Sequence, residues 1–173
     1  MPTLAPNFWL PTPVLEEIFI SYVFDSWIEL LRFENQHNIG SDNPVCLLAL
    51  VCRAWQATVY GCRRLWSRID LTRRTRAQMY LSKAKGVPIH VQWIAHPFLP
   101  LTQAFPTQLL LPHAAMVETL EISHTCDSIL GIRNMKFPIL KKLSLSDGTI
   151  GRDGGLGPWL PTSLPVLQDL RLL

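Results

Sequence analysis

The chain has 173 residues, of which 48% are hydrophobic and 17% are charged, and its formal net charge is +3. This composition excludes an intrinsically disordered protein and leaves room for one ordinary domain, or for a small module followed by a short repeat array. Without a long apolar run or the basic start of a secretory signal, the sequence predicts no membrane span and a cytoplasmic or nuclear location.

The first predicted helix begins at Thr12, a usable N-cap, and places Pro13 where a missing N–H costs nothing. Apolar pairs recur every four residues and predict one apolar stripe that faces a core. These pairs are Val14/Leu15, Ile18/Phe19 and Tyr22/Val23. Trp27 extends the pattern, and the polar stretch 34–43 is predicted to be a loop.

A second helix is predicted from the N-cap Asn43, with Pro44 at its first position, to a terminator at Gly61. One apolar stripe should run along it. Its members are Leu48, Val51/Cys52, Trp55 and Val59. Cys46 and Cys52 are interpreted as buried small hydrophobes and not as reactive thiols.

An apolar pair, Leu65 and Trp66, and a brief extended segment at 69–71 follow. A third helix is predicted from about Arg73 to Lys85. Its expected buried face consists of Ala77, Tyr80, Leu81 and Ala84. Beyond it, apolar and polar residues alternate as in a strand with one buried face. The apolar set is Ile89, Val91 and Trp93, and the polar set is His90 and Gln92.

Three later segments share the pattern apolar-x-x-apolar-x-apolar, at 117–122, 140–145 and 167–172. Their central leucines, at 120, 143 and 170, are 23 and 27 positions apart, within the leucine-rich-repeat range of about 20–29 residues. Stacked units of this kind form one parallel sheet with an apolar spine and a polar outer face. The predicted outward residues, which are the substrate-binding candidates, are Thr119, Glu121, Ser123, Lys142, Ser144, Ser146, Asp169 and Arg171.

Charge is uneven along the chain. Residues 1–51 carry six acidic residues and one basic residue, whereas residues 52–85 carry nine basic residues against Asp70 alone. Three interpretations remain open for the basic region: a solvated helix face, a surface complementary to an acidic protein, and a nucleic-acid site. Nucleic acid is the least favoured, because the region lacks interleaved aromatics and a recognisable nucleic-acid fold.

No catalytic, cofactor or metal constellation can be assembled from the sequence, so a non-enzymatic protein is predicted. The five histidines show no metal-ligand spacing, and the nearest pair is His124 with Cys126. The glycine-rich stretch 148–157 lacks the Lys-Ser/Thr ending of a phosphate-binding loop. The four cysteines form no C-x-x-C pair, which favours a reducing compartment.

Three motifs in order resemble an F-box, in the form found in a large group of fungal, basidiomycete-type F-box proteins with leucine-rich repeats. They read Leu10-Pro11-x-x-Val14-Leu15-x-x-Ile18-Phe19, Leu50-Val51-Cys52-Arg53-x-Trp55 and Leu65-Trp66-x-x-Ile69-x-Leu71. Residues 80–89 also resemble the helix-to-first-strand junction of that group. The chain departs from the family at Pro13, where an acidic residue is usual, and in a long connection at about 24–43.

The resemblance implies a three-helix unit that binds the Skp-family adaptor of a cullin-RING ubiquitin ligase, with repeats that hold a protein substrate. Carried over residue by residue, the adaptor-binding set is Leu10, Pro11, Leu15, Ile18, Val51, Cys52, Arg53, Trp55, Leu65 and Trp66. Some of these must instead hold the three-helix unit together.

We therefore predict an α+β protein with an F-box-like helical domain at 8–71, a linking helix at 72–87 and an incomplete leucine-rich-repeat α/β solenoid at 88–173. The solenoid is predicted to be truncated because it lacks a polar capping repeat. The expected function is substrate recognition in a Skp-cullin-F-box ubiquitin ligase. The alternative is a repeat scaffold without a ubiquitin role, whose basic 53–85 region binds nucleic acid or an acidic protein.

Overall fold

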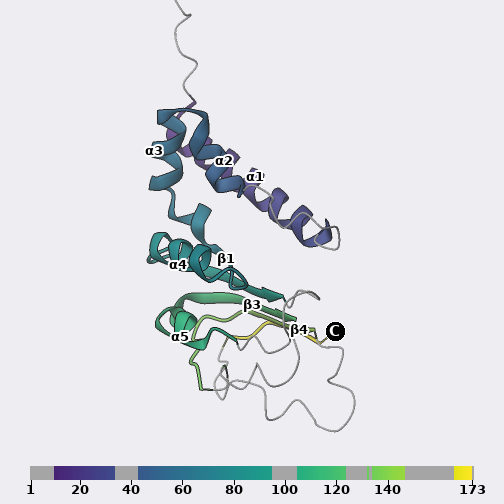
Figure 1. Ribbon diagram of the computed structural model, residues 1–173. Coiled ribbons are helices and arrows are strands. Elements are labelled where there is room, and N and C mark those ends of the chain that lie inside the picture. The colour runs from purple at the N-terminus through teal and green to yellow at the C-terminus, as the bar shows by residue number, and fades with distance from the viewer. Residues whose placement is uncertain are drawn as a thin grey trace, which may run out of the picture. The chain divides into compact units, whose positions relative to one another are not determined.

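The computed structural model describes residues 10–33, 43–94, 105–123, 132, 134–146 and 166–172. The chain divides into two compact units, residues 1–65 and 66–173. The first unit is helical, and the second is built on a five-stranded parallel sheet accompanied by helices (Figure 1). The protein is therefore a mixed α/β chain in which helices precede the sheet.

The described residues of the first unit form three α-helices followed by a 3₁₀ turn. They are α1 (Thr12–Phe33), α2 (Pro44–Val51), α3 (Arg53–Gly61) and η1 (Arg63–Trp66). The predicted start of α1 at Thr12 is confirmed, and the helix continues past Trp27 as its apolar pattern predicted. The predicted cap of α2 is confirmed too, since the Asn43 side-chain oxygen accepts a hydrogen bond from the Val45 N–H at 3.1 Å and Pro44 takes the first helical position.

The prediction of one continuous helix from Asn43 to Gly61 is wrong. Cys52 adopts an extended conformation, with φ −161° and ψ 169°, so it ends α2 and serves as the N-cap residue of α3. Neither glycine nor proline stands at this break, so the sequence carries no local signal for it. Packing supplies the reason, because the bend lets Trp55 of α3 lie against Phe19 of α1 with 4.7 Å between ring centroids.

The second unit contains one sheet in which five parallel strands follow one another in chain order. The strands are β1 (Arg68–Asp70), β2 (Ile89–Ile94), β3 (Val117–Ser123), β4 (Lys142–Ser146) and β5 (Asp169–Leu172). The three repeat segments form β3 to β5 in equivalent register, with Leu120 opposite Leu143 and Leu143 opposite Leu170. The predicted parallel stacking of the repeats is therefore confirmed.

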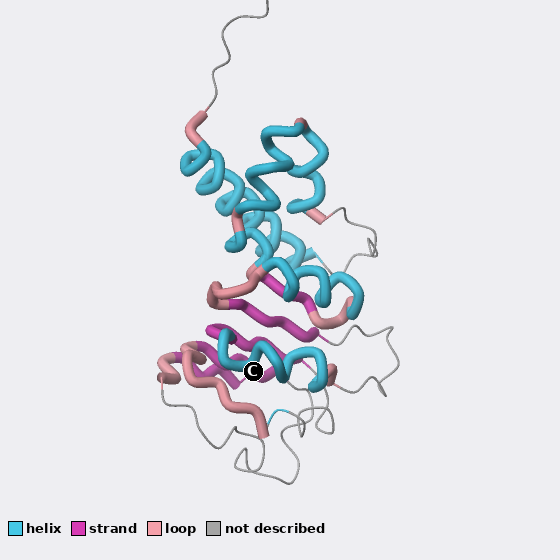
Figure 2. Tube along the Cα trace, turned by 90° about the vertical axis from the view of Figure 1, so that its left-hand side faces the viewer, coloured by secondary structure: helices cyan, strands magenta, loops and turns pink. Residues whose placement is uncertain are grey.

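Helices cover one face of this sheet. They are α4 (Arg74–Lys83), α5 (Thr107–Leu110) and the 3₁₀ helix η2 (Leu111–Met116). Figures 1 and 2 both place α4 and α5 on the same side of the strands. Two edge-to-face ring contacts lie beside these helices. Trp66 of η1 packs against Tyr80 of α4 with 5.1 Å between ring centroids, and Trp93 of β2 packs against Phe105, just before α5, at 5.2 Å. Because side chains alternate along a strand, the polar residues of the strands point to the opposite face.

The predicted third helix is α4, and its four expected core residues are all buried. Gly86 follows it with a φ of 77°, a left-handed conformation that glycine adopts without steric cost. The brief extended segment expected at 69–71 is β1, which pairs with β2 through Ile69 and Val91. Residues 66–71 therefore belong with the sheet, although the sequence analysis grouped them with the helical segment.

Several predictions fall outside the described residues: the loop at 34–42, the glycine-rich stretch 148–157, and the residues His37, His124 and Cys126. Within the described ranges, no helix combines the length and apolar character needed to cross a membrane.

Candidate functional site

Helix α1 presents apolar side chains on two faces. The buried residues are Leu15, Phe19 and Val23. A second set is exposed and is here called the α1 stripe: Leu10, which precedes the helix, and Val14, Ile18 and Tyr22 within it. Phe24 of α1 is also exposed. The prediction of one core-facing stripe is therefore wrong, since each sequence pair contributes one buried and one exposed member. Adjacent residues are separated by about 100° around a helix, so both cannot face the same narrow core.

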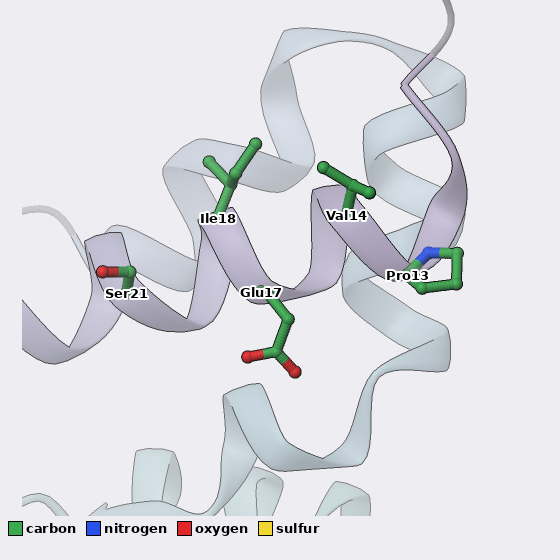
Figure 3. A pocket seen from close by; sticks show the side chains of 5 residues that line it. All are labelled: Pro13, Val14, Glu17, Ile18 and Ser21. Atoms are coloured by element: carbon green, nitrogen blue, oxygen red, sulfur yellow. The ribbon is translucent and has the colours of Figure 1, made fainter.

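A shallow depression runs along the exposed side of α1, lined by Pro13, Val14, Glu17, Ile18 and Ser21 (Figure 3). Val14 and Ile18 project from α1 in the same direction in this view. The Glu17 carboxylate accepts a hydrogen bond from the Arg64 guanidinium at 2.7 Å, in an exposed ion pair. The depression is therefore mainly apolar, and its carboxylate already has a cation.

A second exposed apolar area lies where α2 meets α3. This α2–α3 corner consists of Leu47, Leu50, Val51, Cys52 and Arg53. Leu50 is 78% exposed, although every residue of α2 is apolar. A helix that is apolar on all sides is normally buried on all sides. The described part of the chain covers only one side of α2, and it provides no ion-pair partner for Arg53.

The interpretation of Cys52 as a buried hydrophobe is wrong, because the break between α2 and α3 leaves its side chain exposed. Val51 is exposed for the same reason, so neither belongs to the predicted core stripe. Cys46 is half-buried. Cys62, which the sequence analysis did not single out, is buried, and burial raises the pKa of its thiol.

The ten predicted adaptor-binding residues separate into two groups. Four of them pack inside the protein: Leu15 and Leu65 are buried, Trp55 is half-buried against Phe19, and Trp66 is buried in the sheet unit. The other six are exposed: Leu10, Pro11, Ile18, Val51, Cys52 and Arg53. The helical unit also exposes large apolar residues outside the predicted adaptor-binding set, namely Val14, Tyr22, Phe24, Leu47, Leu50 and Tyr60. For Val14 and Tyr22 the spacing of four from Ile18 was a usable signal.

The second candidate surface is the face of the sheet opposite α4 and α5, here called the polar sheet face. Strand register aligns its side chains in two rows. The first row is Arg68, His90, Thr119, Lys142 and Asp169. The second row is Asp70, Gln92, Glu121, Ser144 and Arg171. Six of the eight substrate-binding candidates thus stand in register. Ser123 and Ser146 are also paired, but their side chains lie outside the described set.

Strands β1 and β2 extend this face with Arg68, Asp70, His90 and Gln92, which the predicted substrate-binding set omitted. The polar alternation at His90 and Gln92 was visible in the sequence, but strands β1 and β2 do not repeat the leucine pattern. A register shift beside His90 adds one more residue to the face. It lets both Glu118 and Thr119 contact the His90 ring, as a β-bulge does.

The carboxylates of the polar sheet face are matched by donors from the same unit. Lys142 donates to Glu121 at 2.6 Å, and Lys141 donates to Glu118 at 2.5 Å. For the remaining two carboxylates, those of Asp169 and Asp70, the donor lies on the same strand or in the turn that follows it. Arg171 donates to Asp169 at 3.0 Å, and Asp70 accepts hydrogen bonds from the backbone N–H and the hydroxyl of Thr72 at 2.8 and 2.6 Å. Most of the charged side chains predicted to point outward therefore already form ion pairs within the sheet unit.

His90 occupies the centre of the first row. Its Nδ1 lies 3.0 Å from the Thr119 hydroxyl, and its Nε2 lies 3.9 Å from a Glu118 carboxylate oxygen. Burial lowers the pKa of His90, and the nearby positive charges of Arg68 and Lys142 act in the same direction, against Glu118 and Glu121. Burial also lowers the pKa of Arg68, which Glu121 partly opposes. The neutral form of His90 is therefore favoured in the folded protein.

This lowered pKa predicts a pH-dependent stability. Because folded His90 resists protonation more than unfolded histidine, its stabilising contribution is complete above about pH 6.5 and is lost as the pH falls through its lower folded pKa. We expect the His90→Gln variant, which can still bond to Thr119, to lose stability less steeply than the wild type between about pH 7 and pH 5. Urea denaturation midpoints across this range measure the difference.

His113 is the matched comparison for this experiment, since burial and the charge of Lys85 also lower its pKa. The His113→Gln variant should remove a different part of the pH dependence of the folding stability, the part that comes from His113. A slope that is the same in His90→Gln and in the wild type would contradict the assignment to His90.

Gln92 differs from the other residues of the second row. It is only 6% exposed, and its side-chain oxygen has no hydrogen-bond partner among the described residues. The sequence placed Gln92 on the polar side of β2, but its burial was not foreseen. A buried acceptor without a donor costs about 1–3 kcal/mol, so most folded proteins avoid one.

No three His, Cys, Asp or Glu side chains of the described residues gather closely enough to hold a metal ion. A second hollow lies on the helix side of the sheet unit, lined by Leu71, Arg74 and residues 105–109. Comparisons of the chain with family models, with curated proteins and with solved structures found no match. The function is therefore argued from the two surfaces and from the motifs that they carry.

Proposed function

We propose that this chain is the substrate-recognition adaptor subunit of a Skp-cullin-F-box ubiquitin ligase. Its helical unit binds a Skp-family adaptor, and through it a cullin, while its leucine-rich-repeat sheet binds a protein substrate. The chain performs no chemistry itself and acts in the cytoplasm or the nucleus. The observation that carries the proposal is the exposed apolar surface on α1, α2 and the start of α3, at positions where the chain resembles an F-box.

The helical surface has the character of a docking site. The resemblance implies a three-helix unit, and the described residues 12–33 and 44–61 contain the helices α1, α2 and α3. Fully burying one Leu, Ile or Val side chain stabilises a complex by about 1.5–3 kcal/mol. The α1 stripe and the α2–α3 corner together offer several such side chains, and Arg53 adds a cation that an acidic group of the adaptor can pair with.

The sheet unit supports the second half of the proposal. Repeat-like strands in one parallel sheet, with leucines in register and polar side chains on the uncovered face, have the organisation of a leucine-rich-repeat recognition surface. A rigid sheet presents its side chains at fixed spacing, which suits recognition of a protein segment.

The test is co-purification of the intact chain with a Skp-family adaptor. We expect the double variant Leu50→Glu, Val51→Glu to lose the complex, because two charges replace apolar side chains at the proposed interface. A hot-spot loss of about 2 kcal/mol corresponds to a roughly thirtyfold weaker Kd. Both residues are exposed, so the variant should remain folded by circular dichroism.

Leu111→Glu is the matched control, since Leu111 is an exposed leucine in the sheet unit. It should leave the complex intact. Equal binding by the double variant and the wild type would remove the α2–α3 corner from the interface. A folded wild-type chain that binds no Skp-family adaptor would refute the proposed function as a whole.

One observation favours the alternative, a repeat scaffold that uses its basic region. Helix α4 carries Arg74, Arg76 and Lys83 and no acidic residue, and Arg74 and Lys83 are exposed. Such a surface attracts nucleic acid or an acidic protein. Duplex DNA binding whose affinity falls steeply as the salt concentration rises would favour this function over the ligase, provided that the salt dependence becomes less steep in the Arg74→Gln, Lys83→Gln variant.

A further inference from the structure

We infer that the polar sheet face binds an uncharged, extended segment of polypeptide, and that Gln92 accepts a hydrogen bond from it. The inference names the substrate class for the sheet of the proposed function and rests on that function only in calling the bound segment a substrate. Two independent observations carry it: the balance of charges on the face, and the buried acceptor of Gln92, for which the described residues supply no donor.

The charges of the two rows cancel. Three residues are positive and three are negative, so the formal charges of the rows sum to zero. The positive residues are Arg68, Lys142 and Arg171, and the negative residues are Asp70, Glu121 and Asp169. His90 adds no charge at neutral pH, because its neutral form is favoured.

These charges are also paired locally. A strongly acidic ligand would compete with Glu121 for Lys142, and a strongly basic ligand would compete with Lys142 for Glu121, because that pair is only 2.6 Å apart and half-buried. Either ligand would displace an existing ion pair before it gained a new one. A neutral ligand leaves the pairs in place and hydrogen-bonds to polar atoms between them.

Gln92 indicates what that ligand supplies. It lies in the second row between Asp70 on β1 and Glu121 on β3, and its buried carboxamide oxygen receives no hydrogen bond within the described part of the chain. An N–H donor of a ligand satisfies this acceptor, and a peptide backbone carries one at nearly every residue. The terminal torsion of glutamine is broad, so the oxygen can turn toward a ligand without strain.

The dimensions agree with an extended peptide. Adjacent strands are about 4.8 Å apart, so the four intervals from β1 to β5 cover about 19 Å, the length of about six extended residues. A peptide that crosses the strands in this way passes both the Gln92 acceptor and the polar side chains of the repeats.

The experiment is a selection of randomised peptides, about twelve residues long and so twice the span of the sheet, displayed on phage. The bait is the intact chain without any adaptor, at about 0.15 M NaCl. We expect the enriched peptides to have a net charge near zero. Synthesised singly, they should bind the Gln92→Leu variant about tenfold more weakly than the wild type.

The free Gln92→Leu variant should at the same time melt about 2–4 °C higher than the wild type, because leucine leaves no acceptor unsatisfied. A merely structural glutamine would not show gained stability together with lost binding. Gln92→Met, which matches glutamine more closely in shape, replaces this variant if leucine prevents folding. The control is Gln78→Leu, an exposed glutamine of α4, which should bind the peptides as the wild type does.

Enrichment of acidic or of basic peptides would overturn the inference, as would neutral peptides that bind Gln92→Leu and the wild type equally. Failure of any peptide to enrich over an uncoated surface would overturn it too. Because the selection contains no adaptor, these results are independent of whether the helical unit binds a Skp-family protein.

Discussion

Replacement of Phe19 by alanine is expected to destabilise the helical unit by about 3–5 kcal/mol, a large share of the roughly 5–15 kcal/mol that stabilises an ordinary folded protein. The Phe19 side chain is 0% exposed and its ring packs against Trp55, so truncation leaves a cavity where α1 meets α3. Hydrogen exchange measured by mass spectrometry follows the two units separately, and the loss of protection should be confined to residues of α1, α2 and α3.

Ile18→Ala is the matched control, because Ile18 precedes Phe19 directly and is 47% exposed. We expect it to change stability by less than about 0.5 kcal/mol while weakening the proposed adaptor complex. The two variants thus distinguish a core residue, Phe19, from an interface residue, Ile18, although the two are adjacent in the sequence. Similar destabilisation by both would mean that the α1 stripe is covered within the protein, and it would remove the stripe from the proposed docking surface.

The second large effect is expected in the sheet. Leu120→Ala should cost the sheet unit about 2–5 kcal/mol, because Leu120 is 0% exposed and lies on β3, which has a paired strand on both sides. The cavity would open directly beneath the polar sheet face, so binding of a peptide there should weaken too. Denaturant midpoints and hydrogen exchange of β2, β3 and β4 measure the loss.

Leu170→Ala provides the comparison within the same repeat pattern. Leu170 occupies the equivalent position of β5 but is 42% exposed, so alanine there should cost less than about 1 kcal/mol. Equal costs at the two positions would show that the repeats contribute uniformly, in conflict with the unequal burial of their leucines.

The same contrast between pattern and packing explains which parts of the fold were predictable. Repeat spacing sufficed for β3, β4 and β5, because a leucine pattern that recurs at a nearly constant interval places equivalent residues side by side in a parallel sheet. Local capping chemistry likewise sufficed for the start of α2, where Asn43 and Pro44 act through neighbouring backbone groups.

The candidate docking residues were only partly predictable. Motif resemblance selected ten positions, but whether a residue such as Leu65 or Val51 faces the core or the solvent depends on contacts with distant segments. The extended conformation of Cys52 decides that question for Val51 and for Cys52 itself. No local residue preference encodes this break, so the apolar periodicity predicted one continuous helix from Asn43 to Gly61.

The sequence by itself thus determined the order of helices before strands, the starts of α1 and α2, the register of the repeats and the set of apolar and polar faces available, because these follow from local capping and from short-range periodicity. Only the tertiary structure decided which apolar face of α1 is buried, where the second predicted helix divides, and that β1 and β2 complete the polar sheet face with Arg68, His90 and Gln92. It also decided that Lys142 binds Glu121 and that Gln92 is buried with no donor from the residues that the structure describes. These properties depend on which distant segments meet, and contacts between segments far apart in the chain arise only when the whole unit packs.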